Sequence, residues 1–250
     1  MKSLKGKVVL ITGAGSGLGQ SHAQLLSELG ADIIINDINK EGAEATAELV
    51  KFNKRSSYIV ISDVVDKKRL HSEIRKATAA LGDVNILVNN AGISSLRLPF
   101  EGITQKILTT MLDINVKGAF YATEAVLPEM KKNKNGKIIN TSSIHGMTGA
   151  NAGSHYTAAK AAILGITKAW AKEFAPWNIL VNAVAPGYIP TPMTLRPGNE
   201  AIRAERTKTI PLGHEGNPKD ISNAVAYFAS EQGDYVTGQV LSPNGGIEIV

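Results

Sequence analysis

The stretch LITGAGSGLGQ, residues 10–20, carries a glycine at every second position. It fails the dinucleotide fingerprint G-x-G-x-x-G, because the sixth position is Leu18 when the count starts at Gly13 and Gln20 when it starts at Gly15. The apolar run VVLIT precedes the glycines and an amphipathic segment follows them, so the local order is strand, turn and helix rather than linker. The glycines then form a tight turn, either without a ligand or as a cradle for a phosphate.

Short apolar runs alternate with longer amphipathic segments along the chain. The runs are rich in β-branched residues, as in strands buried on both faces of a parallel sheet, and cover 7–12, 32–36, 57–61, 85–89, 137–141, 179–184 and 239–243. This order predicts a single-domain, doubly wound α/β fold of the Rossmann type over 1–250, with a seven-stranded parallel sheet flanked by helices. The segment 189–218 holds five prolines and is predicted to be a loop that covers the site.

Composition narrows the classes of protein to which the chain can belong. The 250 residues include no cysteine, which excludes disulfide frameworks and thiolate metal sites and is typical of a cytoplasmic protein. The five histidines have no metal-ligand spacing, so no bound metal is expected. The net charge of +5 comes from dispersed basic residues, and nucleic acid is not an expected partner. No apolar run reaches the roughly 18 residues of a membrane span, so no membrane association is expected.

The glycines have separable roles if the turn holds a pyrophosphate. Gly13 permits the turn, Gly17 lets the backbone approach the anion, and Gly19 lets the helix pack close to the sheet. The helix N-terminus then offers unpaired N–H groups to the phosphates. Gly15 receives no role in this interpretation, and replacing it is expected to cost little dinucleotide affinity.

Asp37 closes the second predicted strand, 18 residues after Gly19. A carboxylate there can accept hydrogen bonds from an adenosine ribose, although an ordinary turn residue at a strand end would look the same. Beside the ribose it would repel a 2′-phosphate by about 4 kcal/mol per unit charge at 4 Å. Ile38 follows instead of a basic residue, so the sequence favours NAD(H) over NADP(H).

Tyr156 and Lys160 lie four residues apart at the start of a predicted helix, which puts both on one face. A phenol must lose about 2 to 3 pKa units to exchange protons near neutrality. A nearby ammonium acts in that direction. The pair alone is a common pattern and specifies no reaction.

Six motifs in a fixed order carry a family resemblance. Over about residues 4–250 the chain resembles the short-chain dehydrogenase/reductase family, of the classical type. The motifs are Thr12-Gly13-(x3)-Gly17-Leu18-Gly19, Asn89-Asn90-Ala91-Gly92, Asn115 in DINVKG, Ser143 thirteen residues before Tyr156, Tyr156-(x3)-Lys160, and Pro186-Gly187-(x3)-Thr191.

The resemblance implies a catalytic set of four residues. Tyr156 would be the general acid in ketone reduction and the general base in alcohol oxidation, and Ser143 would hydrogen-bond the substrate oxygen. Lys160 would lower the pKa of Tyr156 and hold the nicotinamide ribose. Asn115 would hold a water that connects Lys160 to solvent.

The cofactor and substrate contacts follow from the glycine turn, Asp37 and the resemblance together. The expected NAD(H) contacts are Gly13, Ser16, Gly17, Leu18, Gly19, Asp37, Ile38, Asp63, Val64, Asn90, Ala91, Gly92, Tyr156, Lys160, Pro186, Gly187, Ile189 and Thr191. The expected substrate contacts are Ser94, Ser143, His145, Tyr156, Tyr188 and Met193, with Ser95, Leu96 and Asn151 as further pocket positions. Asp63 has a second interpretation, because SDVVD with Asp66 as N-cap is also a helix-start signal. His155 points away from Tyr156 on a helix and is expected to be structural.

The main functional prediction is an NAD(H)-dependent oxidoreductase that interconverts a ketone and a secondary alcohol, as a carbonyl reductase or alcohol dehydrogenase does. The segment DISNAVAYFAS and the ending NGGIEIV also resemble 3-oxoacyl-acyl-carrier-protein reductases, which is the first alternative. Those enzymes mostly use NADPH and dock an acidic carrier on basic residues. Asp37 argues against the first property and Trp177 against the second, although Lys134 and Lys172 are present.

Two further expectations concern function class and assembly. A dinucleotide-binding sensor without catalysis is the alternative from another class, and the complete Asn115, Ser143, Tyr156 and Lys160 set argues against it. Small residues in AAKAAILGITKA would let another helix approach closely, and the resemblance implies a homotetramer through this helix.

Overall fold

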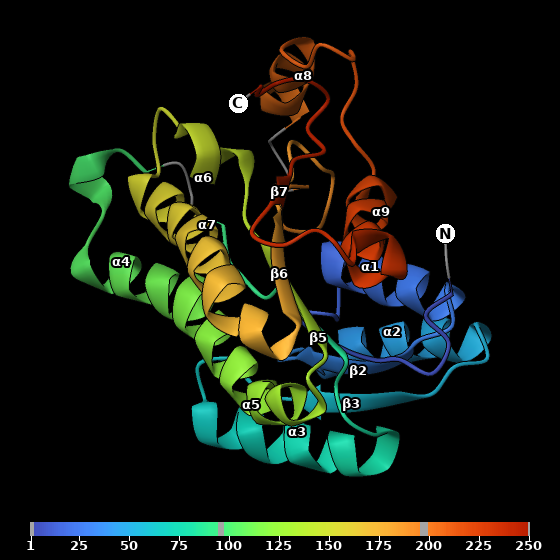
Figure 1. The fold of residues 1–250 in the computed structure, drawn as a ribbon. Helices are drawn as coiled ribbons and strands as arrows, with labels where there is room; N and C mark the ends of the chain where they lie inside the picture. Colours follow the sequence, from blue (N-terminus) through green and yellow to red (C-terminus); the bar gives the residue numbers. More distant parts are fainter. Residues whose placement is uncertain (1–2, 95–97, 196–199, 250) are drawn as a thin grey trace.

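The computed structural model describes residues 3–94, 98–195 and 200–249. In this part of the chain seven strands form one parallel sheet in the order β3-β2-β1-β4-β5-β6-β7 (Figure 1). The strands are β1 Val8–Thr12, β2 Asp32–Asp37, β3 Ser57–Ile61, β4 Ile86–Asn89, β5 Gly136–Thr141, β6 Ile179–Val184 and β7 Val240–Leu241. The predicted doubly wound, seven-stranded parallel sheet is confirmed, although β7 is only two residues long.

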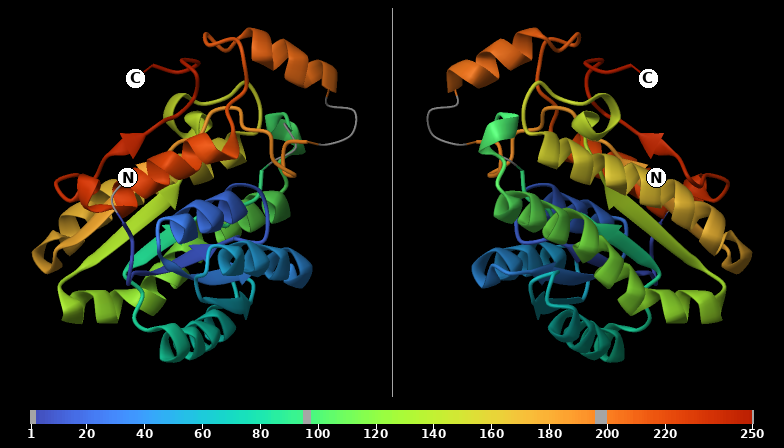
Figure 2. Two further views of the ribbon diagram at one scale, coloured as in Figure 1. Left: turned by 90° about the vertical axis from the view of Figure 1, so that its right-hand side faces the viewer. Right: turned by 90° about the vertical axis from the view of Figure 1, so that its left-hand side faces the viewer.

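Helices cover both faces of the sheet (Figure 2). One layer contains α1 Gly17–Glu28, α2 Lys40–Phe52 and α9 Pro218–Ala229. The other contains α3 Lys67–Leu81, α5 Gly118–Asn133 and α7 Ser154–Phe174. The remaining α-helices of the described chain are α4 Gln105–Leu112, α6 Ile144–Thr148 and α8 Glu200–Lys208.

The two layers explain why the strand sequences are almost continuously apolar. In β1, Val9 and Ile11 pack into the cluster beneath α1 and α9, whereas Val8 and Leu10 pack into the cluster beneath α3 and α5. All five residues of β1 are buried. Because both faces are covered, no position of the strand is left for a polar side chain that needs water.

The strand order places the site. The chain leaves β1 toward β2 and β3 and then returns to the other side of β1 with β4, so β1 lies where the order reverses. Connections on either side of such a point diverge, and a crevice opens beyond the carboxyl ends of the strands. Gly13 and Gly17 have φ angles of +65° and +55°, a region that favours glycine, and they form the turn from β1 into α1 at this edge.

The structure corrects one expectation about local structure and adds one element that the sequence did not indicate. The segment 189–218 is not all loop, because α8 spans Glu200–Lys208 within it and an ion pair of Arg203 with Glu215 holds this helix to the following turn. Between α4 and α5, Asp113–Lys117 form a π-helix that no sequence pattern indicated. Among the described residues no helix is long and apolar enough to cross a membrane, and no cluster of potential metal ligands occurs.

Candidate active site

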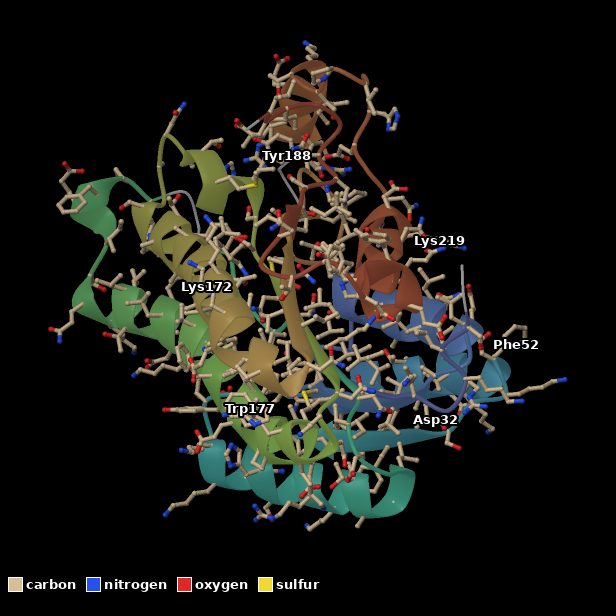
Figure 3. The ribbon with its side chains drawn as sticks, viewed as in Figure 1. Asp32, Phe52, Lys172, Trp177, Tyr188 and Lys219 are labelled. Atoms are coloured by element: carbon tan, nitrogen blue, oxygen red, sulfur yellow. The ribbon has the colours of Figure 1, made fainter. Side chains whose placement is uncertain are left out.

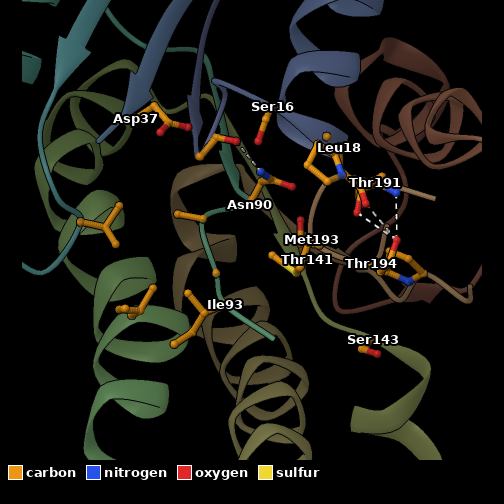
Figure 4. A pocket seen from close by; sticks show the side chains of 18 of the residues that line it. Ser16, Leu18, Asp37, Asn90, Ile93, Thr141, Ser143, Thr191, Met193 and Thr194 are labelled. Atoms are coloured by element: carbon orange, nitrogen blue, oxygen red, sulfur yellow. Dashed lines mark hydrogen bonds between the residues drawn. The ribbon is translucent and has the colours of Figure 1, made fainter. Parts of the chain in front are cut away.

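A cavity of about 360 Å³ lies beyond the carboxyl ends of the strands, in the size range of ligand pockets (Figure 4). It is lined by Gly13, Ser16, Gly17, Leu18, Asn36, Asp37, Ile38, Ser62, Asp63, Val64, Asn90, Ala91, Gly92, Ile93, Ile114, Thr141, Ser142, Ser143, Tyr156, Lys160, Pro186, Gly187, Ile189, Thr191, Pro192, Met193 and Thr194. Every expected cofactor contact except Gly19 is among them. Segments far apart in the sequence therefore converge on one pocket.

Gly19 lies outside the lining because it faces the sheet. A Cβ atom at this position would stand 2.1 Å from the carbonyl oxygen of Gly13, so only glycine lets α1 start this close to β1. The Asn90 amide donates to the carbonyl oxygens of Thr12 and Gly13, at 3.0 and 3.1 Å. The Thr12 hydroxyl accepts from the backbone N–H of Asn90 and of Ala91. These bonds join the turn after β1 to the turn after β4.

Asp37 lies at the end of β2, half-buried on the pocket wall. Its Oδ2 accepts the backbone N–H of Gly15 at 2.7 Å and its Oδ1 accepts that of Asn39 at 2.9 Å. Gly15 is thus not the dispensable glycine that the sequence suggested: a Cβ on it would lie 2.9 Å from the Asp37 carboxylate. Ile38 beside it is 69% exposed and forms another part of the rim.

Asp63 lies both on the pocket wall and in the segment that starts α3. With Val64 it lines the pocket, and its Oδ1 accepts the backbone N–H of Val65 at 3.1 Å. Asp66 caps α3 by accepting the N–H of Arg69, also at 3.1 Å. The helix-start signal and the pocket position coexist because β3 ends at Ile61, five residues before the cap of α3 at Asp66.

Ser143, Tyr156 and Lys160 meet at one end of the pocket. Ser143 follows β5 and caps α6, and Tyr156 and Lys160 lie in the first turns of α7. The Lys160 ammonium is buried, donates to the carbonyl oxygen of Thr141 at 3.0 Å and stands 5.7 Å from the centre of the Tyr156 ring. The spacing thus brings both side chains to the same surface, as the sequence indicated.

Burial dominates the electrostatics of this pair. It raises the pKa of the Tyr156 phenol, and a hydrogen bond with Ser143 acts in the opposite direction. Burial also lowers the pKa of Lys160 to about 8. The sequence predicts that the Lys160 ammonium lowers the pKa of the phenol. In the protein without a bound cofactor, burial outweighs this effect and the pKa of Tyr156 is raised. Near neutral pH the phenol holds its proton.

Asn115 does not line the pocket but lies directly behind it. Its amide nitrogen donates to the carbonyl oxygens of Met111 and Ile93, at 3.1 and 3.2 Å. Its Oδ1 is buried and has no hydrogen-bond partner among the described residues. A Cβ on Gly92 would lie 2.5 Å from that oxygen and 3.3 Å from the Lys160 nitrogen. The π-helix thus turns an unpaired acceptor toward the space beside Lys160.

The expected substrate residues are less tightly grouped. Met193 lines the pocket, whereas Ser94, His145 and Tyr188 do not. The His145 and Tyr188 rings meet edge to face at 6.3 Å, and the Arg206 guanidinium of α8 stands 5.4 Å from the Tyr188 ring. Ser95 and Leu96 lie outside the described residues.

His155 is buried and is not part of the lining, in agreement with its expected structural role. Burial lowers the pKa of its imidazole. The helical rotation that brings Tyr156 to the pocket carries its neighbour away from it.

Several lining residues escaped the sequence analysis: Asn36, Ser62, Ile93, Ile114, Thr141, Ser142, Pro192 and Thr194. Asn36 and Ser62 carried a usable signal, because each directly precedes an aspartate at a strand end. The Asn36 amide donates to the Ser62 carbonyl oxygen at 2.9 Å and joins the two strand ends. No sequence pattern indicated Thr194. Its hydroxyl donates to the Ile189 carbonyl oxygen in a local turn that forms only in the folded chain.

Known proteins share this chain's sequence and fold over nearly its whole length. A family model described as enoyl-(acyl carrier protein) reductase matches residues 13–248. A 3-oxoacyl-(acyl-carrier-protein) reductase of Thermotoga maritima is 39% identical over 248 residues, covering 98% of this chain and 99% of that protein. One of Rickettsia conorii is 39% identical over 250 residues and covers 100% of both.

Solved structures agree with this similarity. Levodione reductase superposes with a TM-score of 0.93 at 33% identity and 97% coverage of both chains. A 3-oxoacyl-(acyl-carrier protein) reductase of Brucella melitensis with bound NAD superposes with a TM-score of 0.92 at 32% identity, covering 99% of this chain and 93% of that chain. With the glycine turn, the Tyr156–Lys160 pair and the strand order in place, the chain belongs to the short-chain dehydrogenase/reductase family, a family of oxidoreductases.

Proposed function

We propose that the protein interconverts a ketone and a secondary alcohol by hydride transfer with NAD(H), and that the ketone is a 3-oxoacyl group. The convergence of Ser143, Tyr156 and Lys160 at one end of a pocket that starts at a glycine turn carries this proposal. NAD(H) supplies or accepts the hydride when bound. The chain's own residues must orient the reactants and move the proton.

The pocket offers contacts to a dinucleotide at four points. The N-terminus of α1 at Gly17 offers N–H groups and the positive end of a helix dipole to a pyrophosphate. Asp37 offers carboxylate oxygens to the adenosine ribose at the other side of the glycine turn. Ile189 and Thr191, which line the pocket, would contact the carboxamide, and Asp63 with Val64 would contact the adenine.

The proton step in ketone reduction needs a donor that is protonated near neutral pH. Burial raises the pKa of Tyr156, so its phenol is protonated and acts as the acid in ketone reduction. Ser143, hydrogen-bonded to the phenol, would hold the substrate oxygen at the same place. Lys160 is an ammonium below about pH 8 and would hold the nicotinamide ribose, and the unpaired Oδ1 of Asn115 would hold a water beside it.

Relatives favour the 3-oxoacyl substrate. Proteins 39% identical over this chain's full length carry the name 3-oxoacyl-(acyl-carrier-protein) reductase. Lys172 on α7 and Trp177 beyond its end lie on the surface away from Tyr188 (Figure 3). The Lys131 ammonium stands 4.0 Å over the Trp177 ring, and Lys134 at the end of α5 and Lys172 on α7 are exposed. An acidic carrier would dock on these lysines.

A second substrate class, a simple cyclic or aliphatic ketone, is favoured by the similarity to levodione reductase. Asp37 also supports this second class. Its carboxylate favours NAD(H), whereas reductases that act on acyl-carrier-protein substrates mostly use NADPH. Both classes use the same proton and hydride steps. They differ in what fills the pocket beyond Ser143.

The proposal is tested by following NADH oxidation with acetoacetyl-coenzyme A and with levodione, a diketone, for the wild type and Tyr156→Phe. We expect turnover of the thioester, and a fall of about 10² to 10⁴-fold in kcat for Tyr156→Phe because the proton donor is lost. Turnover of the diketone alone would establish the second class. A wild-type protein that binds NADH and reduces neither compound would instead be the non-catalytic sensor.

A further inference from the structure

The Asp37 carboxylate is held in place before any ligand arrives. Each of its oxygens accepts one backbone N–H, from Gly15 at 2.7 Å and from Asn39 at 2.9 Å. A carboxylate oxygen has about two acceptor sites, so each retains one for a ligand hydroxyl. Charge-assisted bonds of this kind are short and strong, and they fix the direction in which the remaining acceptor sites point.

Gly15 can approach Asp37 only because it has no side chain. A Cβ on Gly15 would lie 2.9 Å from both the Cγ and the Oδ2 of Asp37 and 3.2 Å from the Ala43 nitrogen. The φ angle of Gly15 is outside the left-handed region, so its backbone would accept an alanine. The requirement for glycine at this position is therefore one of space and not of backbone conformation.

Gly42 makes the same approach from the opposite side. A Cβ on it would lie 2.6 Å from the Gly15 carbonyl oxygen. Its backbone N–H donates to the Asn39 side chain at 2.7 Å, which caps α2 and keeps its first turn against the glycine loop. Gly15 is thus enclosed between Asp37 and α2, and a side chain there has no direction in which to move.

We propose that Gly15 is a positioning residue for cofactor selectivity: its N–H and its lack of a side chain hold the Asp37 carboxylate where it accepts a ribose and repels a 2′-phosphate. This inference rests on the proposed NAD(H) function. Gly19 has a different role, because a Cβ on it would meet the Gly13 carbonyl oxygen and disturb the phosphate turn itself. Selectivity belongs to Gly15, whereas Gly19 serves both dinucleotides equally.

The test is an equilibrium titration of NADH and of NADPH by calorimetry, for the wild type, Gly15→Ala, Asp37→Ala and the double variant. We expect the wild type to bind NADH more tightly. In Gly15→Ala the NADH affinity falls about tenfold, as for a lost hydrogen bond to a charged group, and the preference over NADPH narrows by about as much. In the Asp37→Ala background the same substitution has little further effect, because its clash partner is gone.

Gly102→Ala is the matched control, because its nearest contact would be 3.7 Å, an ordinary van der Waals distance. Thermal unfolding of each variant shows whether it is folded. If Gly15→Ala weakens NADH and NADPH equally, or if its effect adds fully to that of Asp37→Ala, the inference is wrong while the proposed function stands. A wild type that prefers NADPH or binds neither dinucleotide overturns the proposed cofactor and the inference together.

Discussion

At the scale of single residues, the site depends on two buried groups, Tyr156 and Lys160, whose pKa values are shifted in opposite directions. Burial raises the pKa of Tyr156, and it lowers that of Lys160 to about 8. Both shifts have the same cause, since a low-dielectric environment disfavours the charged form of either group. The phenol therefore stays protonated over the range in which the lysine changes charge.

This separation makes a prediction about pH. Because Lys160 is protonated below about pH 8 and neutral above it, kcat/KM for ketone reduction should fall as pH rises through about 8. The measurement is a profile of initial rates between pH 6 and pH 10. Lys160→Arg is the control, since a guanidinium keeps its charge over this range and should remove the inflection even if the rate is lower. The same inflection in Lys160→Arg would assign it to another group.

At the scale of elements, the pairing of α1 with α9 contains a polar contact inside an apolar layer. The His22 side chain is fully buried, and its Nδ1 lies 2.8 Å from the Ser222 hydroxyl. Its Nε2 has no hydrogen-bond partner among the described residues. Burial lowers the pKa of His22 to about 3, so the imidazole is neutral in the folded protein.

The element-scale prediction concerns acid stability. The unfolded chain binds a proton at His22 below about pH 6.5 and the folded chain does not, so folding stability falls as pH falls between 6.5 and 3. From pH 7 to pH 5 this group should remove about 2 kcal/mol from the free energy of unfolding. Urea unfolding at both pH values measures it. In His22→Asn, which keeps a polar atom near Ser222, the loss between the two pH values should be smaller; an equal loss would exclude His22 as its source.

The capping of α2 shows how an element serves the site at a distance. Asn39 caps this helix and also donates its backbone N–H to Asp37. Asn39 therefore contacts both the start of this helix and the Asp37 carboxylate.

At the scale of the whole molecule, the proposed assembly is a homotetramer through α7. Phe120 on α5 is 43% exposed and packs edge to face on Trp170 of α7, with ring centres 5.0 Å apart. An exposed aromatic ring over two adjacent helices is suited to burial against a second copy.

Light scattering of the purified protein should give about four times the chain mass of 26.5 kDa. Phe120→Asp places a charge on the exposed ring position and should lower that mass, whereas Phe52→Asp should not, although Phe52, the last residue of α2, is 86% exposed. A wild type that scatters as a single chain would contradict the proposed assembly.

Much of the fold follows from patterns that depend on local chemistry alone. Buried strands such as β2 read as apolar runs because both faces are covered, and the strand-turn-helix order around Gly13 and Gly17 follows from steric limits on φ. The positions of Asp37 and of Tyr156 with Lys160 follow from strand ends and helical spacing. The doubly wound parallel sheet, the glycine turn and most of the pocket lining were therefore accessible from the sequence.

Tertiary structure alone decided which atoms meet across these elements. The role of Gly15 depends on Asp37 and α2, which lie 22 or more residues further along the chain, so no local pattern distinguishes it from a dispensable glycine. The π-helix at Asp113–Lys117, the helix α8 inside the proline-rich segment and the net upward shift of the Tyr156 pKa are likewise set by packing and burial. Periodicity records which face of an element is buried, but distance and desolvation exist only once the elements are packed together.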